Sequence, residues 1–257
     1  MYGLAEIAVA REAEFHLDLD ENGGALVDET VDALLDWHSK DMLPRYARFM
    51  SAQADVIDRG ALGHGEVDRA VVEMRKLLEA LVAGASRYSA DVLVEHMGPE
   101  KIRYIEARMA ERLAERWEEQ EEPPEERLET RVEGITDNFE RFTGPLSDAQ
   151  KEAIQVYAKA TLADTEVWLR NRANRQSAFT KFLAQEPNKK QIETFVYKII
   201  LRPHEVVDPE YRAISKARWK RLQSLLYGIM TTLSPEQREM MSKTLRRYAA
   251  EMLELVS

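Results

Sequence analysis

Apolar residues recur every three to four positions along almost the whole chain. Spacings of three and four place successive side chains on one face of an α-helix, whereas a β-strand needs alternation at every second position. No segment shows a sustained alternation of that second kind. The pattern therefore predicts an all-α fold. Its cleanest seam predicts a long helix packed almost parallel to a neighbour, and consists of Val67, Val71, Met74, Leu78, Leu81, Ala85, Tyr88 and Val92.

Capping residues, prolines and glycines divide the pattern into nine predicted helices. Pro44 lies inside the second of them and should kink or split it, because proline lacks the amide hydrogen and its ring clashes with the preceding turn. The connections are short, which favours antiparallel neighbours. We expect one elongated bundle of eight or nine helices forming a single domain, 1–257. The predicted helices span residues 3–16, 24–59, 65–96, 99–121, 125–142, 147–185, 189–202, 208–232 and 235–255.

The strongest interruption of the pattern is acidic and contains two prolines. It runs from Glu118 to Glu126 with the sequence EEQEEPPEE. Like charges repel one another there, the prolines stop a helix, and no apolar side chain is present to be buried. We interpret 118–126 as an exposed elbow between two helices. It leaves open a division into sub-domains 1–121 and 125–257.

Three predicted helix starts share one arrangement of residues. They are Met97–Lys101, Leu146–Gln150 and Leu233–Gln237. In each, Leu or Met serves as a hydrophobic staple, Ser or Gly as the N-cap, and Gln or Lys stands at the third helical position. These are ordinary ingredients of a helix N-terminus, so the repeat predicts three helix starts and requires no shared function.

Composition narrows the classes of partner. The chain carries 36 Lys and Arg against 46 Asp and Glu, a formal net charge of -10, and 44% hydrophobic residues. Amphipathic helices reconcile a buried core with so charged a surface. Nucleic acid is excluded as a partner class, because neutralising phosphates requires a basic face. Zero cysteines exclude disulfides, thiol catalysis and cysteine-bound zinc.

Neither a transmembrane helix nor a signal peptide is evident. The longest uncharged stretch, Leu222–Pro235, is shorter than the ~18–20 residues that span a bilayer. The first 21 residues lack the basic start and the apolar run of a signal peptide. Leu4, Ile7 and Val9 give a modest apolar stripe that could dock on the body of the protein or lie at a lipid surface.

No motif in the sequence points to catalysis or metal binding. The five histidines are scattered, with no His-x-x-x-His or Glu-x-x-His pair, and neither Gly-x-Ser-x-Gly nor a phosphate loop occurs. We therefore expect no enzyme activity, no catalytic residue, no metal and no cofactor. We interpret Trp37 as a core residue and His38 as a hydrogen-bonded spacer at the helix surface.

Two basic clusters beside tryptophans stand out in this acidic chain. Arg172 and Arg175 are three residues apart, as are Arg218 and Arg221, so each pair lines one helical face. Ion pairing with acidic neighbours is one interpretation; the other is a surface for an anionic partner, with tryptophan as its apolar floor. If the clusters bind a partner, the variants Arg172→Ala/Arg175→Ala and Arg218→Ala/Arg221→Ala should melt at the normal temperature yet lose salt-sensitive binding. The candidate binding residues are Trp168, Arg172, Arg175, Arg218, Trp219 and Arg221.

Several segments, in order and rough spacing from about residue 17 to 250, resemble an uncharacterised family of proteobacterial all-helical lipoproteins, a domain of unknown function. More locally, Leu-Ser-x-x-Gln is similar to the repeated motif of the small periplasmic chaperones of the Spy type. The family resemblance rests on Ala33–His38, Leu43–Phe49, Trp168-Leu169-x-Asn171-Arg172 with Gln176, Asp208–Tyr211, and Leu233–Gln237 with Leu245, Arg246, Tyr248 and Ala249.

The resemblance implies a location and a fold rather than an activity. Members of the family carry a lipobox cysteine that anchors them in a membrane. This chain has none, and Met1 stands about where the mature end would lie. Either the cysteine was removed together with a signal peptide, or this member is not lipidated. We expect a non-catalytic, lipid-anchored periplasmic protein that binds a protein or envelope component, with chaperone-like character left open. The alternative is a cytoplasmic helical adaptor that acts through a protein partner.

Overall fold

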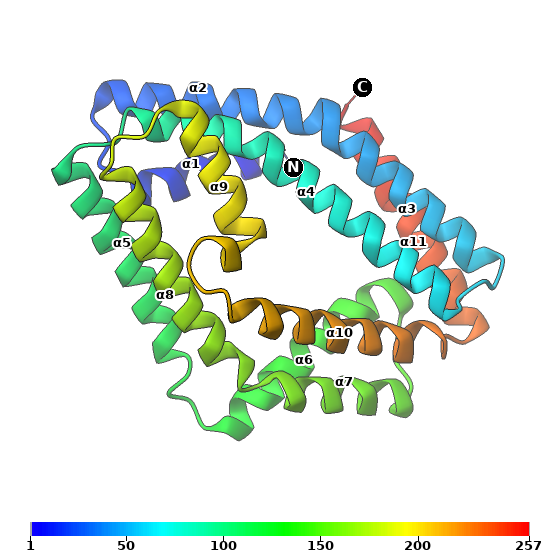
Figure 1. Cartoon of the computed structure of the whole chain (residues 1–257). Coiled ribbons are helices and arrows are strands. Elements are labelled where there is room, and N and C mark those ends of the chain that lie inside the picture. Colours follow the sequence, from blue (N-terminus) through cyan, green and yellow to red (C-terminus); the bar gives the residue numbers. More distant parts are fainter. Residues whose placement is uncertain (1, 257) are drawn as a thin grey trace. The chain divides into compact units, whose positions relative to one another are not determined.

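The all-α prediction is confirmed. The computed structural model describes the backbone of residues 2–256 and the side chains of residues 7–256, and it contains helices and no strand in that part of the chain (Figure 1). The α-helices are α1 (Tyr2–His16), α2 (Glu21–Trp37), α3 (Leu43–Asp58), α4 (His64–Val94), α5 (Pro99–Glu118), α6 (Pro124–Thr143), α7 (Asp148–Thr161), α8 (Asp164–Leu183), α9 (Lys189–Leu201), α10 (Tyr211–Met230) and α11 (Pro235–Glu254).

Pro44 splits the predicted helix 24–59, as expected. A π-helical turn, η1 (His38–Met42), separates α2 from α3. Pro44 then lies in the first turn of α3, where the missing amide hydrogen has no helical partner to lose. A wider turn of this kind absorbs an extra residue without ending the run of helix.

The prediction of one helix over 147–185 is wrong, because α7 ends at Thr161 and α8 begins at Asp164. The Thr161 hydroxyl donates to the Tyr157 carbonyl at 2.9 Å and accepts from Arg131 Nη2 at 2.9 Å. A threonine that bonds one turn back competes with the helical ladder and bends it. With the split at Pro44, this break turns nine predicted helices into eleven in the described part of the chain.

The chain forms two compact units, each assembled from three stretches of sequence. Unit 1 comprises the chain up to His38 with Glu79–Glu119 and Glu166–Arg212. Unit 2 comprises Ser39–Leu78, Gln120–Thr165 and the chain from Ala213 onward. The chain therefore passes from one unit to the other after residues 38, 78, 119, 165 and 212. The acidic elbow contains the third of these passages.

The core of unit 1 is built by α1, α2, α4, α5, α8 and α9. One cluster joins Val27 and Val31 of α2 to Ile105 of α5 and Leu183 of α8. A second places α9 against α4, and there the rings of Phe182 and Phe195 stack with centroids 4.0 Å apart. The helices of unit 1 thus bury their apolar faces against one another, and this holds the polar face of α8 in place.

Trp37 packs directly onto the backbone of α4. A Cβ atom added to Gly84 would lie only 2.0 Å from Trp37 Cζ2, a distance far below van der Waals contact. The Tyr88 ring lies one turn further along α4, with its centroid 6.0 Å from that of Trp37. Only glycine leaves room for the indole at position 84.

The seam predicted along α4 is buried only in part. Val67 and Val71 are buried in unit 2 and Val92 is buried in unit 1, whereas Met74 and Leu78 are exposed. The prediction of one neighbour along the whole seam is therefore wrong. The physical reason is that α4 contributes one half to each unit, so that Met74 and Leu78, which precede the passage from unit 2 to unit 1, enter neither core.

In unit 2, two of the repeated helix starts meet each other. Ser147 with Gln150 and Ser234 with Gln237 each form a complete capping box, as the sequence predicts. Gln150 Nε2 donates to Gln237 Oε1 at 3.1 Å, and Gln237 Nε2 donates to Gln150 Oε1 at 3.0 Å. The glutamines are 1% and 9% exposed. The repeat therefore caps two helices and joins them through a buried, reciprocal amide pair.

Two further N-caps also lie where the sequence places a helix start. Gly98 is the N-cap of α5 but offers no side chain for a hydrogen bond. Asn188, which directly precedes the predicted helix 189–202, also forms a capping box with Gln191.

The N-cap of α2 makes the stability of unit 1 sensitive to acid. Asp20 Oδ1 accepts a hydrogen bond from the Gly23 amide at 2.8 Å, and this bond lowers the pKa of the carboxyl group. A carboxyl whose folded-state pKa is depressed stabilises the fold above its unfolded pKa of ~3.9, and this stabilisation is lost as the pH falls through the folded value.

We therefore expect Asp20→Ala to lower the melting temperature at pH 7 by more than it does at pH 3. Circular dichroism melts of the wild type and the variant at both pH values measure the two differences. An equal difference at both would contradict the assignment of Asp20 as a charged cap.

Candidate binding site on α8

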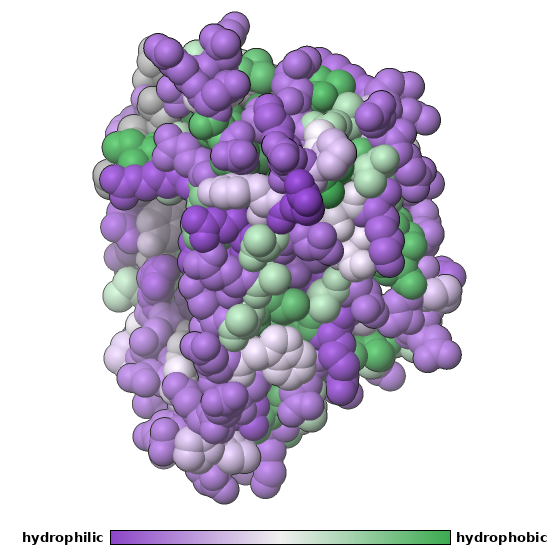
Figure 2. All heavy atoms as spheres, turned by 90° about the vertical axis from the view of Figure 1, so that its left-hand side faces the viewer, coloured by the Kyte–Doolittle hydropathy of each residue, from purple (hydrophilic) through white to green (hydrophobic). Residues whose placement is uncertain are grey.

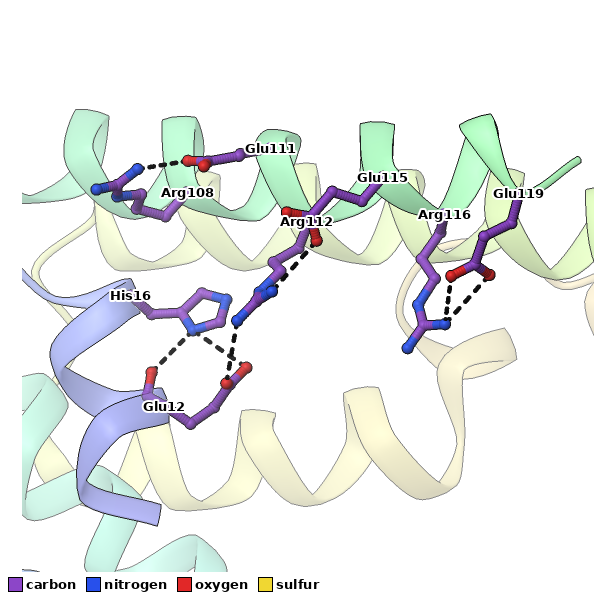
Figure 3. Close-up of polar contacts among 8 residues, drawn as sticks. All are labelled: Glu12, His16, Arg108, Glu111, Arg112, Glu115, Arg116 and Glu119. Carbon is purple, nitrogen blue, oxygen red and sulfur yellow. Dashed lines mark hydrogen bonds and ion pairs between the residues drawn. The ribbon is translucent and has the colours of Figure 1, made fainter. Parts of the chain in front are cut away.

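Three arginines on α5 are paired with acidic side chains of the same segment. Arg108, Arg112 and Arg116 project from one side of the helix, each toward a glutamate three residues later (Figure 3). Arg112 Nη1 lies 3.2 Å from Glu115 and Arg116 Nη1 lies 2.8 Å from Glu119. The α5 surface is therefore neutralised within the helix.

Helix α1 completes this network. Glu12 Oε2 lies 3.7 Å from Arg112 Nη2, and Glu12 also lies beside His16, whose Nδ1 donates to the Glu12 carbonyl at 2.9 Å (Figure 3). The Phe15 ring packs under Arg112, with its centroid 4.2 Å from the guanidinium carbon. These arginines hold α1 against α5.

Four residues of α8 form a polar face of a different kind. Trp168, Asn171, Arg172 and Arg175 are spaced by three and four residues, which places them on one side of the helix. All four belong to unit 1. We call this set the α8 stripe.

The arginines of the α8 stripe have no acidic partner. The Arg172 guanidinium lies 5.4 Å from the centroid of the Trp168 ring. Burial lowers the pKa of Arg175, the Tyr211 hydroxyl raises that pKa, and the charge of Arg172 lowers it further. Among the described residues no carboxylate forms an ion pair with either arginine, and Arg175 Nε is buried without a hydrogen-bond partner.

Asn171 is the most unusual residue of the stripe. Its side chain is 2% exposed, and neither Nδ2 nor Oδ1 has a hydrogen-bond partner in the described chain. A buried polar group left unpaired costs about 1–3 kcal/mol. Such groups in native proteins call for an explanation, of which a bound molecule is one. Sequence reasoning quoted Asn171 only within a family motif and missed it as a site residue, because burial of an amide leaves no mark on the sequence.

The second predicted cluster lies in unit 2 and is partly used within the chain. Arg221 Nη1 donates to Asp164 Oδ2 at 2.6 Å. The Trp219 ring is covered by Arg75, whose guanidinium carbon lies 5.2 Å from the ring centroid. Arg218 is half-buried and makes no ion pair in the described part of the chain. The six predicted residues therefore divide between two units.

The other surfaces of the protein show fewer features that indicate a binding site than the α8 stripe does. The face of the molecule drawn in Figure 2 is mostly hydrophilic, with hydrophobic residues in small separate patches. Ile7 and Val9 are exposed on α1, whereas the side chain of Leu4 lies outside the described residues. An open cleft of about 390 Å³ between α1 and α2 is lined by Ile7, Ala10, Arg11, Glu14, Asp28, Val31 and Asp32.

The described part of the chain has neither a metal-binding cluster nor a membrane-spanning helix. No group of three or more His, Asp or Glu side chains is placed to hold a metal ion there. Nor does any described helix have the length and apolar character needed to cross a membrane.

Residues 15–212 match the "Family of unknown function (DUF6279)". The chain belongs to this family. The DUF6279 match includes the α8 stripe and Tyr211 and ends before Arg218, Trp219 and Arg221. It also stops short of residue 250, to which the resemblance in the sequence extended. Comparisons with curated proteins and with solved structures gave no significant match.

Proposed function

We propose that this DUF6279 protein is a non-catalytic, helical binding protein of the bacterial envelope that recognises a protein or another envelope component through the α8 stripe. The observation that carries the proposal is the buried, unpaired amide of Asn171 beside Arg172 and Arg175, which no carboxylate neutralises. On α5, by contrast, Arg112 and Arg116 are each matched by a glutamate. The α8 stripe leaves charge and hydrogen-bonding capacity for another molecule.

The side chains of the stripe favour binding over catalysis. An asparagine, two arginines and a tryptophan supply hydrogen bonds, positive charge and an apolar face, which are the groups that dominate binding hot spots. None of the four is a nucleophile or a general base at neutral pH.

The envelope location is supported by the resemblance to proteobacterial lipoproteins. In this proposal a lipid anchor upstream of the chain makes the attachment to the membrane, and the exposed Ile7 and Val9 of α1 can add apolar contact at its surface. The Leu-Ser-x-x-Gln repeats are accounted for by capping and pairing, so the proposal does not rest on chaperone-like character. Fractionation of cells that express the natural gene separates this location from that of a cytoplasmic adaptor.

We expect Arg172→Ala/Arg175→Ala to abolish salt-sensitive capture of a partner while changing the melting temperature by less than ~2 °C. Neither arginine has an ion-paired partner to strand, and substitutions away from such networks are nearly neutral for stability. Crosslinking in the native envelope followed by mass spectrometry measures the capture.

Arg218→Ala/Arg221→Ala is the matched control. It removes the same charge from unit 2, breaks the pair between Arg221 and Asp164, and should retain capture. Loss of capture in the control but not in the α8 variant would move the site to unit 2. A large fall in melting temperature for the α8 variant would show that its arginines are structural.

A further inference from the structure

The unpaired atoms of the α8 stripe specify what a ligand must offer. Arg175 Nε–H and the Asn171 Nδ2 amide are donors without acceptors, and Asn171 Oδ1 is an acceptor without a donor. A complementary ligand therefore brings acceptors for both donors and a hydrogen-bond donor of its own next to those acceptors.

The positive charge of the two arginines favours an anionic acceptor. Arg175 is partly removed from water and lies close enough to Arg172 to be repelled by it. An anion that binds here offsets, by its own attraction, both the lost hydration of Arg175 and its repulsion by Arg172. A planar carboxylate fits the guanidinium edge through two parallel hydrogen bonds.

We infer that the α8 stripe binds a peptide group in which a carboxylate stands next to an amide N–H, as at the C-terminal end of a polypeptide. Arg175 and the Asn171 Nδ2 amide donate to the carboxylate, and Asn171 Oδ1 accepts from the N–H of the residue that bears it. Trp168, with Arg172 over its ring, provides an apolar surface for that residue's side chain. This inference rests on the proposed function, because it names the chemistry of the same site.

A phosphate group satisfies the stripe less well. A phosphomonoester dianion offers acceptors alone, so Asn171 Oδ1 would stay buried and unpaired. An uncharged amide fails in the opposite way, because it leaves the arginines without an anion. Two unpaired donors, Arg175 Nε–H and Asn171 Nδ2, lie beside one unpaired acceptor, Asn171 Oδ1. This combination selects a carboxylate with a neighbouring N–H.

The test uses the full chain labelled with ¹⁵N and three small probes. The Arg175 Nε–H resonance is assigned by its absence in Arg175→Lys and followed while N-acetylglycine is added. We expect a saturable shift with a Kd in the millimolar range, as suits so small a ligand. N-acetylglycinamide, which lacks the carboxylate, and inorganic phosphate at matched ionic strength should leave the resonance in place.

Two variants and a control locate the binding. Because Arg175→Lys has no Nε–H, the variants are compared by isothermal titration. Arg175→Lys and Asn171→Leu should each weaken N-acetylglycine binding by about tenfold or more, since each removes hydrogen bonds to a charged group. Arg170→Lys, on an exposed position of the same helix, should bind as the wild type does. Binding of phosphate without N-acetylglycine, or no binding at all, would overturn the inference, as would wild-type affinity in both variants.

This outcome is separable from that of the proposed function. If the envelope partner is captured through Arg172 and Arg175 but N-acetylglycine does not bind, the carboxylate chemistry is wrong and the proposed function stands. If N-acetylglycine binds and the double variant captures its partner normally, the small-molecule site stands and the proposed role of the stripe in partner binding fails.

Discussion

Gly84→Ala is expected to destabilise unit 1 by about 2–4 kcal/mol, with a matching fall in the urea midpoint. The added methyl would lie 2.0 Å from Trp37 Cζ2 and 2.1 Å from Cη2. The indole ring is rigid, and a small side-chain rotation cannot move it far enough to relieve this overlap. Either α2 or α4 must therefore shift. Urea unfolding followed by far-ultraviolet circular dichroism measures the change.

Gly134→Ala is the control for this substitution. Gly134 also lies within a helix, α6, and a Cβ atom there meets nothing within 4 Å. Alanine at that position should stabilise the protein by about 0.5–1 kcal/mol through helix propensity. Equal stability of the two variants would show that Trp37 does not pack on Gly84. Trp37→Leu in the Gly84→Ala background should recover part of the loss, which a double-mutant cycle quantifies.

The second large effect is expected in unit 2, at the pair of glutamines. Gln150→Leu and Gln237→Leu should each cost about 2–4 kcal/mol, because each removes both hydrogen bonds between the two buried amides and one arm of a capping box. Gln237 Nε2 also donates to the Pro145 carbonyl at 2.8 Å, so its loss strands a backbone acceptor as well.

A double-mutant cycle distinguishes pairing from capping. The variant with both leucines should lose less stability than the sum of the two single variants, since the same two inter-glutamine bonds are lost in either single variant and can be lost only once. Gln191→Ala removes the same capping arm from α9 at an exposed position and should cost about 1 kcal/mol or less. Additive losses in the cycle would mean that the glutamines act as two separate caps.

Local features of the fold could be predicted from the sequence, and those that depend on distant partners could not. Pro44, the acidic elbow and the two Leu-Ser-x-x-Gln segments act through their own neighbours in the chain, and each falls at a helix boundary. Thr161 ends α7 with the help of Arg131, which lies 30 positions away. No spacing rule for helices anticipates such a contact.

The candidate site shows the same limit. Helical spacing predicted that Arg172 and Arg175 share a face, and the tryptophan beside them was visible in the sequence. This cluster differs from the one in unit 2, where Arg221 pairs with Asp164, in that neither of its arginines has an acidic partner and Asn171 is buried beside them. Both depend on which helices pack around α8, and the same residues on a solvated helix would carry no such signal.

Assembly of each unit from three separated stretches has a consequence for synthesis on the ribosome. Unit 1 lacks its last stretch until Arg212 has emerged, and unit 2 lacks its last stretch until the chain is nearly finished. At ~5–20 residues per second, the growing chain spends roughly 10–40 s with neither interior closed. During this time the apolar faces of helices already synthesised stay exposed to water, because the helices that cover them have not yet been translated. A cut at the acidic elbow would release two fragments, neither of which contains a whole unit.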